Sequence, residues 1–211
     1  MYNITLISTR HDTNGKCNSD ELLKIIEKIC PEVIFLEALK SDYTDYQHLC
    51  FTSSGIYHQR LEIQAIQKYN HKQIFEYIPI LDNGLSDDFE KILKLFYEHP
   101  EYQKLNNYYN SLEKQYGFQF LNSEKSIEIQ EELRELGKHI FKNNELYQKA
   151  DASIDDYENS MIRNIYAYCK ENTFKTAIFM CGVAHRKSII EKIQKYQMQE
   201  TTKLNWNTAI V

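Results

Sequence analysis

Four ionisable side chains stand where apolar, strand-like runs of this sequence end. Each run is followed by a residue that can bind a metal ion or exchange a proton: His11, Glu37, Asp82 and His185. Ligands of open parallel sheets bind beyond the carboxyl ends of the strands, so we expect these side chains to meet at one edge. Two imidazoles beside one or two carboxylates could hold a divalent cation or carry out acid–base catalysis.

The second histidine belongs to a Gly182-Val183-Ala184-His185 element, which predicts a tight turn from a strand into a helix. Glycine permits the turn, and His185 is then expected in the first helical turn. Unpaired backbone amides and the positive end of the helix dipole lower the pKa of an imidazole at that position. A neutral imidazole suits either a metal ligand or a general base.

The runs that carry these residues predict an α/β fold. Residues 4–7, 33–36 and 175–181 are apolar without polar alternation, as in parallel strands that are buried on both faces. Apolar residues recur at helical spacing from Leu22 to Ile29, which indicates a helix between the first two runs. Strand, helix and strand in this order form a βαβ unit, and the chain is expected to have a central, mostly parallel sheet flanked by helices.

Further elements extend this sheet and interrupt it once. The pattern predicts a helix over residues 57–70, a strand over 75–81 and a last edge strand over 204–211. From about residue 86 to 149 the periodicity is helical throughout. We therefore expect an all-helical insertion within a single α/β domain that spans residues 1–211.

The composition excludes several classes of function. A net charge of −5 and a pI near 5.8 argue against a nucleic-acid partner, which requires a clustered basic surface. No apolar run approaches the roughly 20 residues that cross a bilayer, and no signal-peptide pattern opens the chain, so we expect a cytoplasmic protein with no membrane partner. The cysteines are odd in number, scattered and without a Cys-x-x-Cys pair, which indicates free thiols.

Four short motifs, in this order, resemble the TraB/Tiki superfamily, which includes the erythromycin-esterase-like and ChaN-like proteins. They are Ser8-Thr9-Arg10-His11, Val33-Ile34-Phe35-Leu36-Glu37, Arg163-Asn164 in a helix expected near residues 153–171, and Gly182-Val183-Ala184-His185. Ser8 stands where the first motif of the family has glycine, and a long helical insertion before the arginine helix is also similar to the family. The resemblance implies an α/β fold with its site at the strand ends.

The first hypothesis is a hydrolase that cleaves an ester or amide bond in a small-molecule or peptide substrate, as the resemblance implies. In a metal-dependent mechanism, His11, Glu37 and His185 would bind Mn²⁺ or Zn²⁺, which would activate water. Arg163 would then stabilise the negative charge that develops on the carbonyl oxygen. In a metal-free mechanism, a histidine–glutamate pair would act as the general base. The catalytic residues would be His11, Glu37, Arg163 and His185.

Four further residues have supporting roles in this hypothesis. Glu62 and Asp82 would orient an imidazole or hold Arg163, and the alternative is that both are ordinary surface or turn carboxylates. Arg10 and Arg186 adjoin the two motif histidines and would bind an anionic group of the substrate, with a surface role as the alternative.

Two other functions fit the same residues. A non-catalytic protein could bind haem, iron or another small ligand at the same edge of the sheet. Tyrosines of the insertion would then help to form an apolar slot: Tyr97, Tyr102, Tyr108, Tyr109 and Tyr116. Alternatively, the insertion could contact a partner protein, as part of an interaction or toxin-associated module. The sequence leaves the oligomeric state open.

Overall fold

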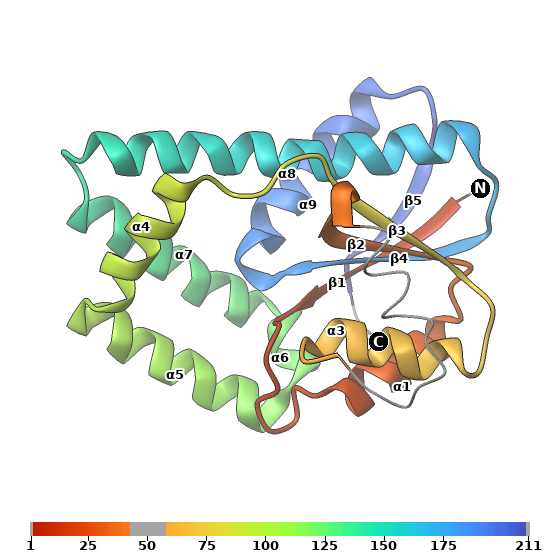
Figure 1. Ribbon diagram of the computed structural model, residues 1–211, viewed down its shortest axis with the longest axis horizontal. Coiled ribbons are helices and arrows are strands. Elements are labelled where there is room, and N and C mark those ends of the chain that lie inside the picture. The colour runs from red at the N-terminus through yellow and green to blue at the C-terminus, as the bar shows by residue number, and fades with distance from the viewer. Residues whose placement is uncertain (1, 43–57, 210–211) are drawn as a thin grey trace.

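The computed structural model describes residues 2–42 and 58–209 of the chain. Within these residues, five parallel strands form one sheet in the order β3-β2-β4-β1-β5 (Figure 1). The strands are β1 (Tyr2–Thr9), β2 (Val33–Leu39), β3 (Glu76–Leu81), β4 (Thr176–Gly182) and β5 (Leu204–Asn207). The prediction of an α/β fold with a mostly parallel central sheet is confirmed.

The helices are α1 (Ser19–Ile29), α3 (Leu61–Asn70), α4 (Asp87–Tyr97), α5 (Pro100–Tyr116), α6 (Phe118–Leu121), α7 (Glu124–Ile140), α8 (Glu145–Glu171) and α9 (Arg186–Gln199), with short 3-10 helices η1 (Lys40–Asp42) and η2 (Val183–His185). Helices α1 and α3 lie together on one face of the sheet, and α8 and α9 cover the other (Figure 1). On β1, Leu6 packs in the core beneath α8 and α9, whereas Ile7 packs in the core beside α1 and α3. Burial on both faces explains why the strands lack polar alternation.

Between β3 and β4 the described chain contains helices and no strand, as the sequence predicted. Helices α4, α5 and α7 lie beyond the carboxyl ends of the strands, and α8 runs from this region back across the sheet (Figure 1). The helix expected from about residue 153 begins at Glu145, where the Asn144 side chain accepts a hydrogen bond from the Tyr147 amide. The insertion boundary expected near residue 149 therefore falls inside one continuous helix.

Two interlocked glycines join the helical region to the loop after β1. Gly15 and Gly117 have positive φ angles of 59° and 58°. A Cβ atom on Gly15 would lie 2.5 Å from the carbonyl oxygen of Lys114, and one on Gly117 would lie 2.6 Å from that of Lys16. Both positions therefore require glycine, because the backbones of the loop and the end of α5 are in direct contact.

Three boundaries differ from those that the sequence predicted. β2 continues to Leu39, so Glu37 lies within the strand, although the pairing of β2 with β4 ends at Leu36. β5 ends at Asn207, and the last two residues of the expected strand, 210 and 211, lie outside the described residues. α3 begins at Leu61, and the expected start at residue 57 likewise lies outside them.

Two expectations from composition also concern the described residues. Cys17, Cys30, Cys169 and Cys181 are free thiols, as predicted, whereas Cys50 lies outside these residues. In residues 2–42 and 58–209, no helix has the length and apolarity to cross a bilayer.

Candidate functional site

A cavity of about 520 Å³ lies between the carboxyl ends of the strands and the helices beyond them. We call it the chamber. Helices α4, α5, α7 and α8 provide its walls, and residues at the ends of β1, β2 and β4 form its floor. Three residues that were expected to meet at this edge, His11, Glu37 and His185, all line the chamber.

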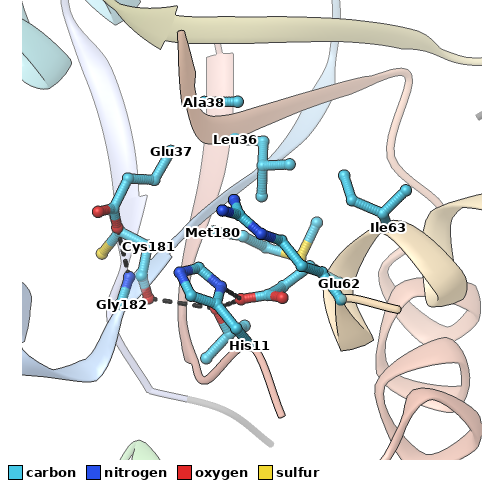
Figure 2. Close-up of a pocket in the computed structure, with 11 residues that line it drawn as sticks. His11, Leu36, Glu37, Ala38, Glu62, Ile63, Met180, Cys181 and Gly182 are labelled. Atoms are coloured by element: carbon cyan, nitrogen blue, oxygen red, sulfur yellow. Dashed lines mark hydrogen bonds and ion pairs between the residues drawn. The ribbon is translucent and has the colours of Figure 1, made fainter. Parts of the chain in front are cut away.

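His11 is held by a carboxylate from α3. Its Nδ1 donates a hydrogen bond to Oε1 of Glu62 at 3.1 Å (Figure 2). Oγ1 of Thr9 donates to the same oxygen at 2.7 Å. Glu62 is buried, whereas the His11 side chain is 51% exposed. The hydrogen bond with Glu62 raises the pKa of His11 above its ordinary value. Because Nδ1 is engaged, Nε2 is the nitrogen left to accept a proton from a bound molecule.

A second cavity beside His11 has a volume of about 10 Å³, room for roughly one water molecule. Figure 2 shows the side chains around it, which come from the ends of β1, β2 and β4 and from the start of α3. Oε2 of Glu62, which lines this cavity, is buried and has no hydrogen-bond partner within the described residues. One water molecule here would satisfy that oxygen and lie next to the imidazole.

Two short hydrogen bonds fix the carboxylate of Glu37. Oη of Tyr157 donates to Oε1 at 2.6 Å, and the amide of Gly182 donates to Oε2 at 2.6 Å. A Cβ atom on Gly182 would lie 3.4 Å from Oε2 of Glu37 and 3.6 Å from Cδ2 of His185, so both groups lie against the backbone at this position. Burial, together with the charge of Glu37, raises the pKa of Tyr157 and keeps its hydroxyl a donor.

His185, the last residue of η2, lies between two carboxylates. Its Nδ1 donates to Oε1 of Glu158 at 2.8 Å, and its Nε2 faces Oε1 of Glu37 at 3.6 Å. Burial lowers the pKa of His185, but Glu37 and Glu158 outweigh it, and the net pKa is raised. The expectation of a lowered pKa was wrong, because two nearby carboxylates in a buried setting exceed the effect of a helix end.

The arginines beside the two histidines differ in their access to the chamber. Arg10 lines it, with its guanidinium bound by Asn110 at 2.5 Å and by Glu113 at 2.8 Å. Arg186, for which the sequence predicted a role in substrate binding, is only 3% exposed and does not line the chamber. It ties β1 to the segments after α6 and β5 by donating to Ser8, Asn122 and Thr208.

Arg163 and Asp82 pair with each other, and neither lines the chamber. A guanidinium nitrogen of Arg163 donates to Oδ2 of Asp82 at 2.8 Å, and Nζ of Lys40 donates to Oδ1 at 2.8 Å. The bond from Lys40, with that from Arg163, lowers the pKa of Asp82 to about 2. The Arg163 side chain is 59% exposed, because it lies off the buried stripe of α8. This placement does not bring Arg163 to His11 and His185, as its expected catalytic role requires.

The expected metal ligands do not form a metal-binding group. Within the described residues, no three or more His, Cys, Asp or Glu side chains are arranged to hold an ion. His11 and His185 each donate Nδ1 to their own carboxylate, and both oxygens of Glu37 accept hydrogen bonds. These side chains form a network of oriented acids and bases at the floor of the chamber.

Three residues of the site were not identified from the sequence. Tyr157 and Glu158 hold Glu37 and His185, and Arg134 of α7 lines the chamber and donates to the carbonyl oxygen of Ala184 at 3.2 Å. The sequence did contain an indication for Glu158, because this carboxylate lies on the face of α8 that is otherwise occupied by buried apolar residues. The analogous signal in α3 is Glu62, which is buried among apolar neighbours.

No known family model and no curated protein matches this sequence. A solved structure with a similar arrangement is that of a mutant of the erythromycin esterase EreC in its open conformation. The match has 13% sequence identity and a TM-score of 0.30, and it covers 96% of this chain and 59% of that one. This chain thus spans less than two thirds of the length of that protein. A likeness at this TM-score carries no argument about function, which rests on the residues themselves.

Proposed function

We propose that this protein is a hydrolase of the TraB/Tiki and erythromycin-esterase type that cleaves an ester or amide bond by general-base catalysis. The observation that carries the proposal is the chain of hydrogen bonds from Thr9 through Glu62 to His11, beside a cavity sized for one water molecule. An oriented imidazole next to a water site, at the floor of a ligand-sized chamber, is the arrangement that water activation requires.

His11 acts as the base in this mechanism. Its Nε2 takes a proton from the water molecule, whose oxygen attacks the carbonyl carbon and gives a tetrahedral intermediate. Glu62 keeps the proton of the neutral imidazole on Nδ1 and stabilises the imidazolium that forms. When the intermediate collapses, the imidazolium returns its proton to the leaving oxygen or nitrogen, so no proton is gained or lost by the enzyme.

His185 supplies positive charge at the same end of the chamber. Its raised pKa favours the imidazolium form, which Glu158 holds in position through Nδ1. A cation beside the reacting carbonyl stabilises the oxyanion of the intermediate. Arg134, which holds the backbone just before His185, adds a second positive charge to the chamber wall.

The test measures hydrolysis of p-nitrophenyl esters and of matched p-nitroanilides by the dialysed protein, with and without a chelator. His11→Ala is expected to lower kcat/KM about 10²- to 10⁴-fold, the usual contribution of general-base catalysis. Free imidazole is expected to restore part of the lost rate. His139→Ala, an exposed histidine of α7, is the matched control and should leave kcat/KM unchanged.

Two results would contradict the proposal. One is the absence of turnover on every ester and anilide tested. The other is full activity in a His11→Ala variant whose circular dichroism and melting temperature match those of the wild type. Activity that the chelator abolishes and Mn²⁺ or Zn²⁺ restores would instead assign the reaction to a metal ion.

A further inference from the structure

The two ends of the chamber differ in chemistry. The floor, at the strand ends, presents charged and polar groups: Arg10, His11, Asp12, Glu37 and His185. The walls, formed by α4, α5, α7 and α8, present mainly apolar and aromatic groups: Phe89, Leu93, Phe96, Tyr102, Leu133 and Tyr147. A bound molecule that matches both ends must carry a polar group on one side and a sizeable apolar body on the other.

Aromatic rings pack against one another at the apolar end. The ring centroids of Phe96 and Tyr102 are 4.5 Å apart, and those of Phe141 and Tyr147 are 5.5 Å apart. Burial raises the pKa of Tyr102 to about 12, so this phenol stays neutral at physiological pH. Of the five tyrosines considered from the sequence, Tyr97 and Tyr102 line the chamber.

Gly137 lies in the last turn of α7, where glycine costs helix stability relative to alanine. Its φ angle is not positive, so the backbone does not require glycine there. A Cβ atom would lie 3.4 Å from Oη of Tyr147 and 3.6 Å from Cζ of Phe96. Both rings therefore lie against α7 at Gly137, beside the chamber. The chamber volume of about 520 Å³ is within the range of pockets that enclose drug-sized ligands.

We infer that the chamber binds the apolar acyl part of the substrate, so that the protein prefers medium-chain acyl esters or acyl amides whose carbonyl lies at the floor near His11. This inference rests on the proposed hydrolase function and adds the substrate class. The acyl chain extends from the charged floor towards the aromatic end of the chamber. Burial of the chain in the chamber supplies binding energy, while the floor carries out the chemistry.

The kinetic test compares p-nitrophenyl esters with acyl chains from acetyl to decanoyl. Transfer of one methylene group from water into an apolar site is expected to raise kcat/KM about threefold to fourfold, until the chamber is filled. Leu93→Trp fills the chamber from α4 and should flatten this dependence. Leu95→Trp makes the same change two residues away on the same helix, where the side chain is 54% exposed and outside the chamber lining, and should leave it intact.

A binding test separates this inference from the proposed function, because it needs no turnover. Dansylaminoundecanoic acid should bind at one saturable site, with a Kd raised at least tenfold by Leu93→Trp and by Ile154→Trp, which fills the chamber from α8, but not by Leu95→Trp. Ile154→Trp keeps the test open if Leu93→Trp fails to fold.

The possible outcomes distinguish failure of this inference from failure of the hydrolase proposal. Probe binding with this variant pattern supports the apolar chamber even if no ester is hydrolysed, in which case the hydrolase proposal alone fails. Hydrolysis that is independent of chain length, together with absent or variant-insensitive probe binding, overturns the inference and leaves the hydrolase proposal standing.

Discussion

Replacement of Glu158 by glutamine tests directly how the second histidine is held. Glu158 is buried, and its two oxygens meet His185 at 2.8 Å, Lys192 at 3.3 Å and the hydroxyl of Ser188. Glu158→Gln keeps the shape of the side chain and one hydrogen bond to the imidazole, but it removes the charge. The pKa of His185 is therefore expected to fall.

The magnitude follows from the kind of bond that is lost. A hydrogen bond to a charged group contributes about 1.5–3 kcal/mol and a neutral one about 0.5–1.5 kcal/mol, so the substitution removes roughly 1–2 kcal/mol. The same loss lowers the pKa of His185, because the imidazolium form loses its charged partner. For a chain of this length, each kcal/mol lowers the melting temperature by about 2–4 °C, which gives a fall of about 2–8 °C.

The pH dependence of this loss has a definite sign. Because the pKa of His185 is raised in the folded state, its stabilising contribution is complete below the ordinary value of 6.5 and is lost as pH rises through the raised pKa. The pKa of Glu158 is lowered despite its burial, because His185 leads the groups that favour its charged form, so its contribution requires a pH above about 4.5. The wild type and Glu158→Gln should therefore differ most between these two values.

The assay is the NMR titration of the His185 ring, combined with thermal unfolding monitored by circular dichroism from pH 4 to 9. Glu135→Gln is the control, because this exposed carboxylate of α7 pairs only across one helical turn with Lys138, and its loss should leave both measurements unchanged. An unchanged pKa of His185 in Glu158→Gln would refute the assignment of Glu158 as the group that holds it charged.

Two further predictions concern the general base His11 and the contact between Gly117 and the loop after β1. The value of kcat/KM should rise with pH through a midpoint above 6.5, because His11 must be deprotonated and the hydrogen bond with Glu62 raises its pKa. Glu62→Gln should move this midpoint to lower pH. Gly117→Ala should lower the free energy of unfolding, measured by urea titration, by about 1–3 kcal/mol, because φ is positive and the new Cβ would lie 2.6 Å from a backbone carbonyl oxygen. Gly84→Ala is the control. The nearest atom to its new Cβ is 4.0 Å away, so the free energy of unfolding should change little.

The strands and most helices could be predicted because their signals are local. Runs such as residues 4–7 and 33–36 are apolar at every position, which is what burial on both faces of a parallel sheet demands. The start of α8 was placed too late because its first turns extend beyond the sheet and line the chamber, with Tyr147, Ala150 and Ile154, so they were assigned to the helical insertion. The extension of β2 past Glu37 was missed because a charged residue reads as the end of a strand.

The site could be predicted only in part because its partners come from distant segments. Strand ends placed His11, Glu37 and His185 together, since parallel strands bring their carboxyl ends to one edge. Which carboxylate meets which histidine depends on how α3 and α8 pack on the sheet, and no local pattern gives that. Arg163 was chosen from its motif, yet the rotation of α8 that buries Met161 and Ile165 turns Arg163 towards Asp82.

Three buried glutamates at the polar end of this site are better explained by function than by their contribution to stability. Glu62, Glu113 and Glu158 each lie on a different helix and each binds a residue that follows β1 or β4: His11, Arg10 and His185 respectively. Buried ion pairs are often no more stabilising than apolar residues of the same size, so three of them at one edge of a sheet are not explained by folding alone. They are explained if the side chains they hold must be kept in fixed orientations for function.

The placement of these glutamates separates the elements that hold the histidines from those that form the chamber walls. Glu62 and Glu158 come from α3 and α8, which lie on opposite faces of the sheet, so the sheet and its two helical layers fix the histidines (Figure 1). Helices α4 and α5 form part of the chamber wall, whereas the hydrogen bonds that hold the two imidazoles come from α3 and α8. Substitutions in the walls should therefore change which ester is preferred, while substitutions of the glutamates change the rate for every ester alike.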